Sequence, residues 1–252
     1  MKILVTNDDG IFSSGIYALW EVAKEFGDVT IVAPNTQKSA VGHGITISNP
    51  IYVREIEREN ECKGFAVSGT PADCVKIGIK SILPSRPPDL ILSGINIGSN
   101  LGNNIIYSGT VAAAVEGAVV GIQSIALSID SYNPTSFETS KAVVRKMIKF
   151  VMNNKIPSGT ILNVNVPYCE VEDLKGYKIT MQGNQYFNDQ FDKRIDPRGR
   201  PYYWMTGEMI DNDKTIEYDG LAVSAGYVSI TPINFKMTNV GFMKKLKKVM
   251  IE

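Results

Sequence analysis

The chain has 252 residues, with 26 Lys and Arg against 26 Asp and Glu, so its formal net charge is zero. A balanced charge gives no general attraction to nucleic acid or to anionic lipid, which argues against a nucleic-acid-binding protein. The single histidine, His43, excludes zinc sites built from several histidines. The three cysteines (Cys62, Cys74 and Cys169) are odd in number and far apart, so we expect reduced, buried thiols in a cytoplasmic protein. The most apolar stretch, 105–129, contains Glu116 and several glycines, so no membrane span is expected.

The first two thirds of the chain alternate short apolar runs with segments of helical periodicity. The runs predicted as strands span 2–6, 29–33, 64–68, 89–93, 123–129 and 160–166. The segments predicted as helices span 16–26, 70–83, 108–121 and 136–153, and 94–104 is predicted as a loop. Unbroken apolar strands separated by helices are typical of a parallel sheet covered on both faces. The sequence therefore predicts an α/β fold with a Rossmann-like, mostly parallel sheet flanked by helices.

The segment 182–224 is polar and aromatic and lacks a helical period. We expect it to form strands or a long hairpin that projects from the core, with its aromatic side chains in core or subunit contacts. A returning strand is predicted at 225–232, and a terminal helix with a solvated lysine face at 239–250. No repeat or linker divides the chain. We therefore expect a single domain with a core (1–181), a protruding extension (182–224) and a closing strand and helix (225–252).

Four polar segments follow predicted strands or begin a predicted helix. They are residues 7–10, 35–46, 94–100 and 108–110. Because ligands of open parallel sheets bind beyond the carboxyl ends of the strands, we expect these segments to meet at one edge of the sheet. Together they offer carboxylates, hydroxyls, amides and free backbone N–H groups.

This mixture suits a hard divalent cation together with a phosphate group. Asp8 and Asp9 supply negative charge, and Ser39 and Asn96 are candidate neutral oxygen ligands of the kind that Mg²⁺ and Mn²⁺ accept. Glycine-rich loops let backbone N–H groups approach an anion closely. The helix that begins at 108–110 adds an N-terminus, which favours a phosphate.

Each of these residues also has a purely structural interpretation. The acidic pair is equally compatible with a helix cap, Asn96 with a turn, and Ser108 and Thr110 with caps of the helix that they begin. His43 is either a loop histidine with a local hydrogen bond or an acid–base group beside the metal. Sequence motifs for nucleoside triphosphates, for dinucleotides and for a serine nucleophile are absent from the sequence.

Five segments together are far more specific than any one of them. They are 1–10 (MKILVTNDDG), 39–48 (SAVGHGITIS), 68–73 (SGTPAD), 93–104 (SGINIGSNLGNN) and 107–117 (YSGTVAAAVEG). In order and spacing they resemble the SurE family, the survival protein E nucleotidases, and the tail GYVSITPI at 226–233 fits as well. The resemblance covers nearly the whole chain. It implies a Rossmann-like core and a metal-dependent phosphatase that acts on nucleoside monophosphates.

The resemblance carries particular residues with it. It implies that one divalent metal ion, Mg²⁺ or Mn²⁺ with Co²⁺ as a further candidate, is held by Asp8, Asp9, Ser39 and Asn96. The residues expected to bind the substrate or its phosphate are Asn7, Gly42, His43, Asn96, Gly98, Ser108, Gly109 and Thr110. Family members assemble as dimers or tetramers with the C-terminal extension exchanged or packed between subunits, so a homodimer or homotetramer is expected here. No partnership with a nucleic-acid polymer or a membrane is expected.

The expected reaction is hydrolysis of a 5′- or 3′-nucleoside monophosphate by a metal-activated water. Asp8 and Asp9 are the expected catalytic residues, and one of them could accept the proton of the water. An aspartyl phosphatase of the haloacid dehalogenase type is an alternative, although its carboxylates lie two residues apart and these are adjacent. A metal–nucleotide-binding module without turnover is the alternative from outside enzymology.

Overall fold

A computed structural model of the protein describes residues 1–58 and 62–250. In that part of the chain the main sheet has nine strands. They are β1 (Lys2–Thr6), β2 (Asp28–Pro34), β3 (Val53–Glu57), β4 (Lys63–Val67), β5 (Leu90–Ile97), β6 (Gln123–Asp130), β7 (Thr160–Pro167), β8 (Tyr177–Ile179) and β11 (Val228–Asn234). Across the sheet their order is β3-β4-β2-β1-β5-β6-β7-β11-β8. The six strands from β4 to β7 in this order are parallel to one another. Strand β3 pairs antiparallel with β4, and β11 pairs antiparallel with β7 but parallel with β8.

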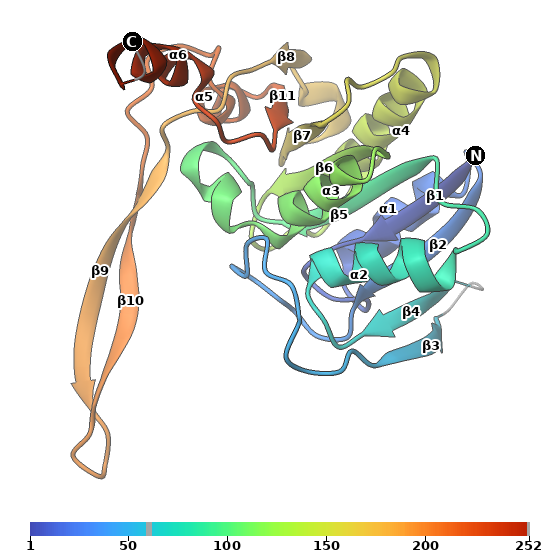
Figure 1. The fold of residues 1–252 in the computed structure, drawn as a ribbon, viewed down its shortest axis with the longest axis horizontal. Helices are drawn as coiled ribbons and strands as arrows, with labels where there is room; N and C mark the ends of the chain where they lie inside the picture. Colours follow the sequence, from blue (N-terminus) through green and yellow to red (C-terminus); the bar gives the residue numbers. More distant parts are fainter. Residues whose placement is uncertain (59–61, 251–252) are drawn as a thin grey trace.

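Helices cover both faces of this sheet (Figure 1). The α-helices are α1 (Ser14–Ala23), α2 (Pro71–Ile77), α3 (Gly109–Val119), α4 (Glu138–Asn153), α5 (Asp219–Ser224) and α6 (Val240–Met250). Side chains of α1 and α4 share one core cluster, while α2 and α3 pack on the other face. The predicted α/β class, with a mostly parallel sheet between helical layers, is confirmed.

Successive strand residues point to opposite faces, and this alternation builds the two cores. Leu4 of β1 packs in the cluster beneath α2 and α3, whereas Ile3 and Val5 pack beneath α1 and α4. Helix α1 connects β1 to β2, and α4 connects β6 to β7, both across the same face of the sheet. Along the strand order the two connections step in opposite directions. The two crossovers therefore have opposite hands, although right-handed crossovers are strongly preferred.

Side-chain caps fix where the helices of the core begin. Ser13 caps α1, and Ser108 caps α3 by accepting a hydrogen bond from the N–H of Val111. Thr70 and Asp73 form a reciprocal capping box at α2, with Pro71 as the first helical residue. The prediction of Thr70 as N-cap and Pro71 as N1 is confirmed, and its reason is that proline lacks the N–H that the first turn leaves unpaired.

Several predicted boundaries are wrong. The helix predicted at 16–26 ends at Ala23, and the one predicted to reach residue 83 is α-helical only to Ile77, followed by a π-helical turn at Gly78–Ile82. The predicted loop 94–104 is largely structured: after a register shift β5 continues to Ile97, and a 3₁₀ helix covers Gly102–Tyr107. Glycine and asparagine suggested a loop there, but hydrogen bonding to β6 holds the backbone in the sheet.

The C-terminal third carries the predicted hairpin. Strands β9 (Tyr186–Ile195) and β10 (Pro201–Ile210) pair antiparallel and project far from the body of the protein (Figure 1). Helix α5 lies in the segment for which no helix was predicted, and β3 and β8 were also missed, because elements this short have no clear period.

The aromatic side chains of the hairpin do not belong to the core. Phe191, Tyr203 and Trp204 are each more than half exposed. The prediction that they lie in the core is therefore wrong, whereas contacts with another subunit stay a prediction. All three cysteines are free thiols; Cys62 and Cys74 are buried as expected, whereas Cys169 is only partly buried. Within the described residues, no helix has the length and apolar character needed to cross a bilayer.

Candidate active site

The acidic segment leaves the carboxyl end of β1 in a tight, buried turn. Gly10 adopts a φ of 95°, a backbone conformation that glycine tolerates and other residues rarely adopt. The side-chain amide of Asn7 donates to the carbonyl of Gly10 at 3.0 Å and to the Ser13 hydroxyl at 2.8 Å. Asn7 is completely buried, so in this structure it holds the turn that presents Asp8 and Asp9.

Asp8 is held at the N-terminus of α3. The Thr110 hydroxyl donates to Asp8 Oδ1 at 2.5 Å, and the Asp8 carbonyl accepts from the N–H of Lys38 at 2.7 Å. The side chain is almost fully buried. Burial raises the pKa of the Asp8 carboxyl, while hydrogen bonds from the Thr110 hydroxyl and from backbone N–H groups at Gly109 and Thr110 counteract that rise. A helix N-terminus thus stabilises a carboxylate that would otherwise resist ionisation.

Asp9 links three segments of the site. Its Oδ2 accepts from the N–H of Ile97 at 3.0 Å, and its Oδ1 lies 3.4 Å from the Gln37 amide nitrogen, which also donates to Ser39 Oγ at 2.9 Å. Burial first, and the neighbouring charge of Asp8 second, raise the pKa of Asp9 to about 6 against the effect of the Ile97 N–H. Within the described part of the chain, no positively charged side chain is among the groups that shift the pKa of Asp9.

The four residues expected to hold a metal come from three segments that meet at this edge of the sheet. Asp9 bonds to the residue after Asn96, and Gln37 joins Asp9 to Ser39. The Asn96 side-chain amide donates to the carbonyl of Gly98 at 2.5 Å, which leaves its Oδ1 as the oxygen that can bind a ligand. Among the described residues, no Lys or Arg pairs with Asp8 or Asp9, and no group of three or more His, Cys, Asp and Glu is gathered. The candidate donor set consists of two carboxylates and neutral oxygens.

The segment 108–110 is built tightly against Asp8. The Ser108 hydroxyl caps α3 and the buried Thr110 hydroxyl is given to Asp8, so both have structural partners here. A Cβ added to Gly109 would lie 2.8 Å from the Asp8 Cβ and 3.0 Å from Pro71. Only glycine allows this approach of helix and acidic loop. A role of these residues in binding phosphate stays a prediction.

The loop that carries Ser39 is fastened to α2, to α3 and to Tyr107, which lies just before α3. The N–H of Gly42 donates to the Tyr107 carbonyl at 2.9 Å, and the N–H of Thr46 donates to both carboxylate oxygens of Asp73 at 3.1 Å. His43 Nε2 lies 2.9 Å from Glu116 Oε2 on α3. The predicted substrate residues Gly42 and His43 thus lie on a loop anchored beside α3.

The glycine-rich segment after β5 is supported by the end of β6 and by the C-terminal part of the chain. The N–H of Gly98 donates to the Ile129 carbonyl at 3.1 Å, and the ring of Tyr132 lies against the position where a Gly98 Cβ would be. Further along, the buried carboxylate of Asp219 accepts from the N–H groups of Gly102 at 3.0 Å and of Gly183 at 2.9 Å. Burial raises the pKa of Asp219, opposed by these N–H groups. The base of the hairpin and the loop that leads to α3 are therefore joined.

Sequence reasoning missed four residues that build the site: Gln37, Asp73, Glu116 and Asp219. Two of them had a signal in the sequence. Asp73 completes a Thr-x-x-Asp capping pattern, and Glu116 is the one charged residue in an otherwise apolar helix. The partners of Gln37 and Asp219 come from distant segments and follow only from the fold.

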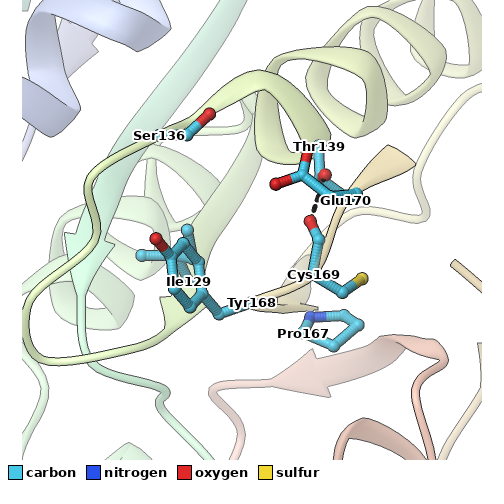
Figure 2. Close-up of a pocket in the computed structure, with 7 residues that line it drawn as sticks. All are labelled: Ile129, Ser136, Thr139, Pro167, Tyr168, Cys169 and Glu170. Atoms are coloured by element: carbon cyan, nitrogen blue, oxygen red, sulfur yellow. Dashed lines mark hydrogen bonds between the residues drawn. The ribbon is translucent and has the colours of Figure 1, made fainter. Parts of the chain in front are cut away.

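A cavity of about 260 Å³ lies at the same edge of the sheet, at the ends of β6 and β7 and the start of α4 (Figure 2). Its lining residues are Ile129, Ser136, Thr139, Pro167, Tyr168, Cys169 and Glu170. The Thr139 hydroxyl donates to the Cys169 carbonyl there, at 2.6 Å. None of the residues predicted for the metal or the phosphate lines this cavity.

Comparison with known proteins identifies the family. The family model "Survival protein SurE" matches residues 3–189. The proteins named 5'-nucleotidase SurE from Syntrophobacter fumaroxidans and Thermosipho melanesiensis are each 45% identical to this chain; the matches cover 98% of it in both cases, and 99% and 97% of the relatives. The crystal structure of the SurE protein from Aquifex aeolicus superimposes with a TM-score of 0.85, at 43% identity and 99% coverage of both chains. The chain belongs to the SurE family.

Proposed function

We propose that this protein is a 5'-nucleotidase that depends on a divalent metal ion and hydrolyses nucleoside monophosphates. The observation that carries the proposal is the pair Asp8 and Asp9, held side by side at the edge of the sheet without a basic partner among the described residues. The name 5'-nucleotidase SurE, carried by relatives with 43–46% identity over nearly the whole chain, supports the substrate class.

The residues present fit a hard divalent cation. Two adjacent carboxylates, a hydroxyl and an amide oxygen form an oxygen-rich set that suits Mg²⁺ or Mn²⁺. Burial first, and the charge of Asp8 second, raise the pKa of Asp9 to about 6, and a bound cation would offset both effects. Asp8, Asp9, Ser39 and Asn96 would hold the ion. When bound, it would supply charge neutralisation at the phosphate and a more acidic water.

The two carboxylates have different roles in this proposal. Asp8 has one oxygen committed to the Thr110 hydroxyl and is nearly inaccessible, so it would contribute a fixed charge and its second oxygen to the ion. Asp9 is less buried, and its Oδ1 has only a 3.4 Å contact with Gln37. Asp9 is therefore the group better placed to hold the proton released when water attacks.

The phosphate would be oriented by groups around the acidic pair. We assign this role to residues 108–110, to the loop residues Asn7, Gly42, His43 and Gly98, and to Asn96. Backbone N–H groups of the glycine segments and the N-terminal end of α3 favour negative charge. Release of phosphate from 3'-monophosphates belongs to the same proposal, because the groups assigned here would contact the phosphate and not the sugar.

The experiment is phosphate release from 5'-AMP, 3'-AMP and p-nitrophenyl phosphate in the presence of Mg²⁺ or Mn²⁺, with a parallel attempt to trap an aspartyl phosphate from labelled substrate. We expect turnover of 5'-AMP without a trapped intermediate. A trapped intermediate would favour the aspartyl phosphatase mechanism instead. Tight binding of 5'-AMP without release under any metal would favour a binding module.

We further propose that the protein acts as a homodimer or homotetramer. Helix α6 buries none of its residues, and the projecting hairpin exposes Phe191, Tyr203 and Trp204. Exposed aromatic side chains gathered on one projecting element are typical of a surface that another subunit covers.

We also propose a cytoplasmic location. The buried free thiols of Cys62 and Cys74 support a reducing compartment.

A further inference from the structure

Glu116 is a buried carboxylate that the proposed chemistry leaves without a role. It lies on α3, and only 6% of its side-chain surface is exposed. Ionised groups are rarely buried unless they are paired, because removing them from water is energetically costly. A carboxylate at this position of an alanine-rich helix therefore needs partners that compensate it.

Two side chains from other segments provide that compensation. Lys76 Nζ on α2 lies 2.6 Å from Glu116 Oε1, and His43 Nε2 lies 2.9 Å from Glu116 Oε2. The hydrogen bond with His43 is the largest of the effects that lower the pKa of Glu116, and the contacts with Lys76 add to it. Each carboxylate oxygen thus has its own partner, one fixed on a helix and one on a loop.

The contact with Glu116 orients the imidazole of His43, which lies on the loop that also carries Ser39. With Nε2 directed at a carboxylate, the N–H lies on Nε2, and in the neutral ring Nδ1 becomes the acceptor. Nδ1 has no hydrogen-bond partner in the described ranges 1–58 and 62–250, and 38% of the side chain is exposed. A carboxylate that orients an imidazole with its other nitrogen free is the arrangement used in proton-transfer sites.

The same contact fastens the loop that carries Ser39. The loop 39–47 is otherwise attached by the N–H groups of Gly42 and Thr46 and by the Thr70 hydroxyl, which donates to the Gly44 carbonyl at 2.7 Å. These contacts use backbone groups of the loop, and the Thr46 side chain also bonds to Asp73 on α2. His43 is the residue through which the loop makes a side-chain contact with α3.

We propose that Glu116 is a positioning residue, which fixes the His43 ring and through it the loop 39–47 relative to the acidic pair. This inference rests on the proposed nucleotidase function for its kinetic consequence, but the placement of the loop is independent of it. Lys76 keeps one oxygen of Glu116 occupied, so that the other is available to His43.

The test combines hydrogen exchange with kinetics on Glu116→Gln, His43→Ala and the double variant. Glutamine keeps the volume of Glu116 but has an amide NH2 in place of one carboxylate oxygen, so either Lys76 or His43 then faces a donor where it had an acceptor. His43 is on a loop, so its replacement leaves the core intact. Glu21→Gln is the matched control, because Glu21 pairs with Lys141 at 2.8 Å on the opposite face of the sheet.

We expect the amides of Gly42 and Thr46 to exchange about tenfold faster in Glu116→Gln, as the loss of a hydrogen bond to a charged group predicts. The double variant should exchange no faster than His43→Ala, because both changes break one contact. The kcat/KM for phosphate release should be about tenfold lower in Glu116→Gln than in the wild type, with a changed pH profile. In Glu21→Gln it should equal the wild-type value.

Unchanged exchange at Gly42 and Thr46 in Glu116→Gln would overturn the inference, as would fully additive effects in the double variant. Faster exchange together with no phosphate release by the wild type would support the placement of the loop and refute the proposed function. The two failures are therefore distinguishable.

Discussion

The Thr110 hydroxyl donates to Asp8 Oδ1 at 2.5 Å, across 102 residues of sequence. This bond joins the end of the first strand to the start of α3, where the backbone N–H groups of Gly109 and Thr110 also face the carboxylate. Asp8 is therefore oriented by groups that belong to the sheet and helix framework. The geometry of the acidic pair depends on how β1, β5 and α3 pack.

Removing the Thr110 hydroxyl tests this dependence. In Thr110→Val the volume is kept, but Asp8 loses the bond that orients it. We expect phosphate release to fall about 10- to 100-fold, as is typical when a group that orients a ligand is lost. Thr139→Val is the matched control, since that buried hydroxyl bonds to the Cys169 carbonyl at the cavity. Equal losses in both variants would contradict the role of Thr110.

The approach of Gly109 to Asp8 predicts a steric effect. In Gly109→Ala the new methyl would lie 2.8 Å from the Asp8 Cβ, so the helix or the loop must shift. We expect the free energy of unfolding to fall by about 1–3 kcal/mol, together with activity. Gly241→Ala is the control, since its methyl would meet only Asn239 Oδ1, at 3.5 Å. Denaturant unfolding of both variants measures the difference, and a fully stable, active Gly109→Ala would refute the close packing.

Asp9 carries an electrostatic cost in the protein without metal. Burial and the charge of Asp8 raise its pKa to about 6, so the carboxylate that prevails at neutral pH is less stable in the folded protein than it would be in water. Asp9→Asn removes that cost. We expect the melting temperature of the metal-free variant to equal or exceed that of the wild type. Asp130→Asn, which alters an exposed carboxylate bonded to Ser99, should leave it unchanged. A markedly lower melting temperature for Asp9→Asn would contradict the prediction.

Glu116 makes stability depend on pH with a defined sign. Its pKa is lowered by the hydrogen bond with His43 and by the hydrogen bond and charge of Lys76. A lowered pKa in the folded protein stabilises it at pH values above the unfolded value, about 4.3 for Glu, and this stabilisation disappears as the pH falls through the folded value. The difference in unfolding free energy between wild type and Glu116→Gln should therefore be present at pH 7 and vanish in acid. Urea unfolding across this range measures it, and a difference that grows in acid would show the opposite linkage.

The unburied terminal helix predicts an effect on assembly. Deletion of residues 239–252 should lower the molar mass measured by light scattering, because α6 packs no residue into its own subunit. Residues 251–252 lie outside the described part of the chain. Circular dichroism of the truncated chain controls for unfolding. An unchanged molar mass in a folded truncated protein would assign assembly to another surface.

The sequence predicts the framework well and the connections between segments poorly. Apolar runs such as Ile3–Val5 and the caps Thr70 and Ser108 express local rules, and the strands and helices follow them. The glycine and asparagine content of 94–104 suggested a loop, because the pairing with β6 that keeps it in the sheet is a long-range contact.

The same limit applies to the candidate site. The acidic pair, Ser39 and Asn96 could be proposed from their positions after strands. Gln37 between Asp9 and Ser39, and Asp219 beneath Gly102, depend on pairs of segments that only the folded chain brings together. Sequence patterns therefore predicted which polar groups gather at this edge of the sheet, and the fold determined which neighbours orient them.

The most direct test of the central claim is phosphate release from 5'-AMP by wild type and Asp9→Asn, first with EDTA and then with Mg²⁺ or Mn²⁺ restored. We predict no release with EDTA, release by the wild type after metal is restored, and none by Asp9→Asn under either condition. Release in EDTA, or wild-type turnover by Asp9→Asn, would contradict a metal-dependent nucleotidase built on this acidic pair.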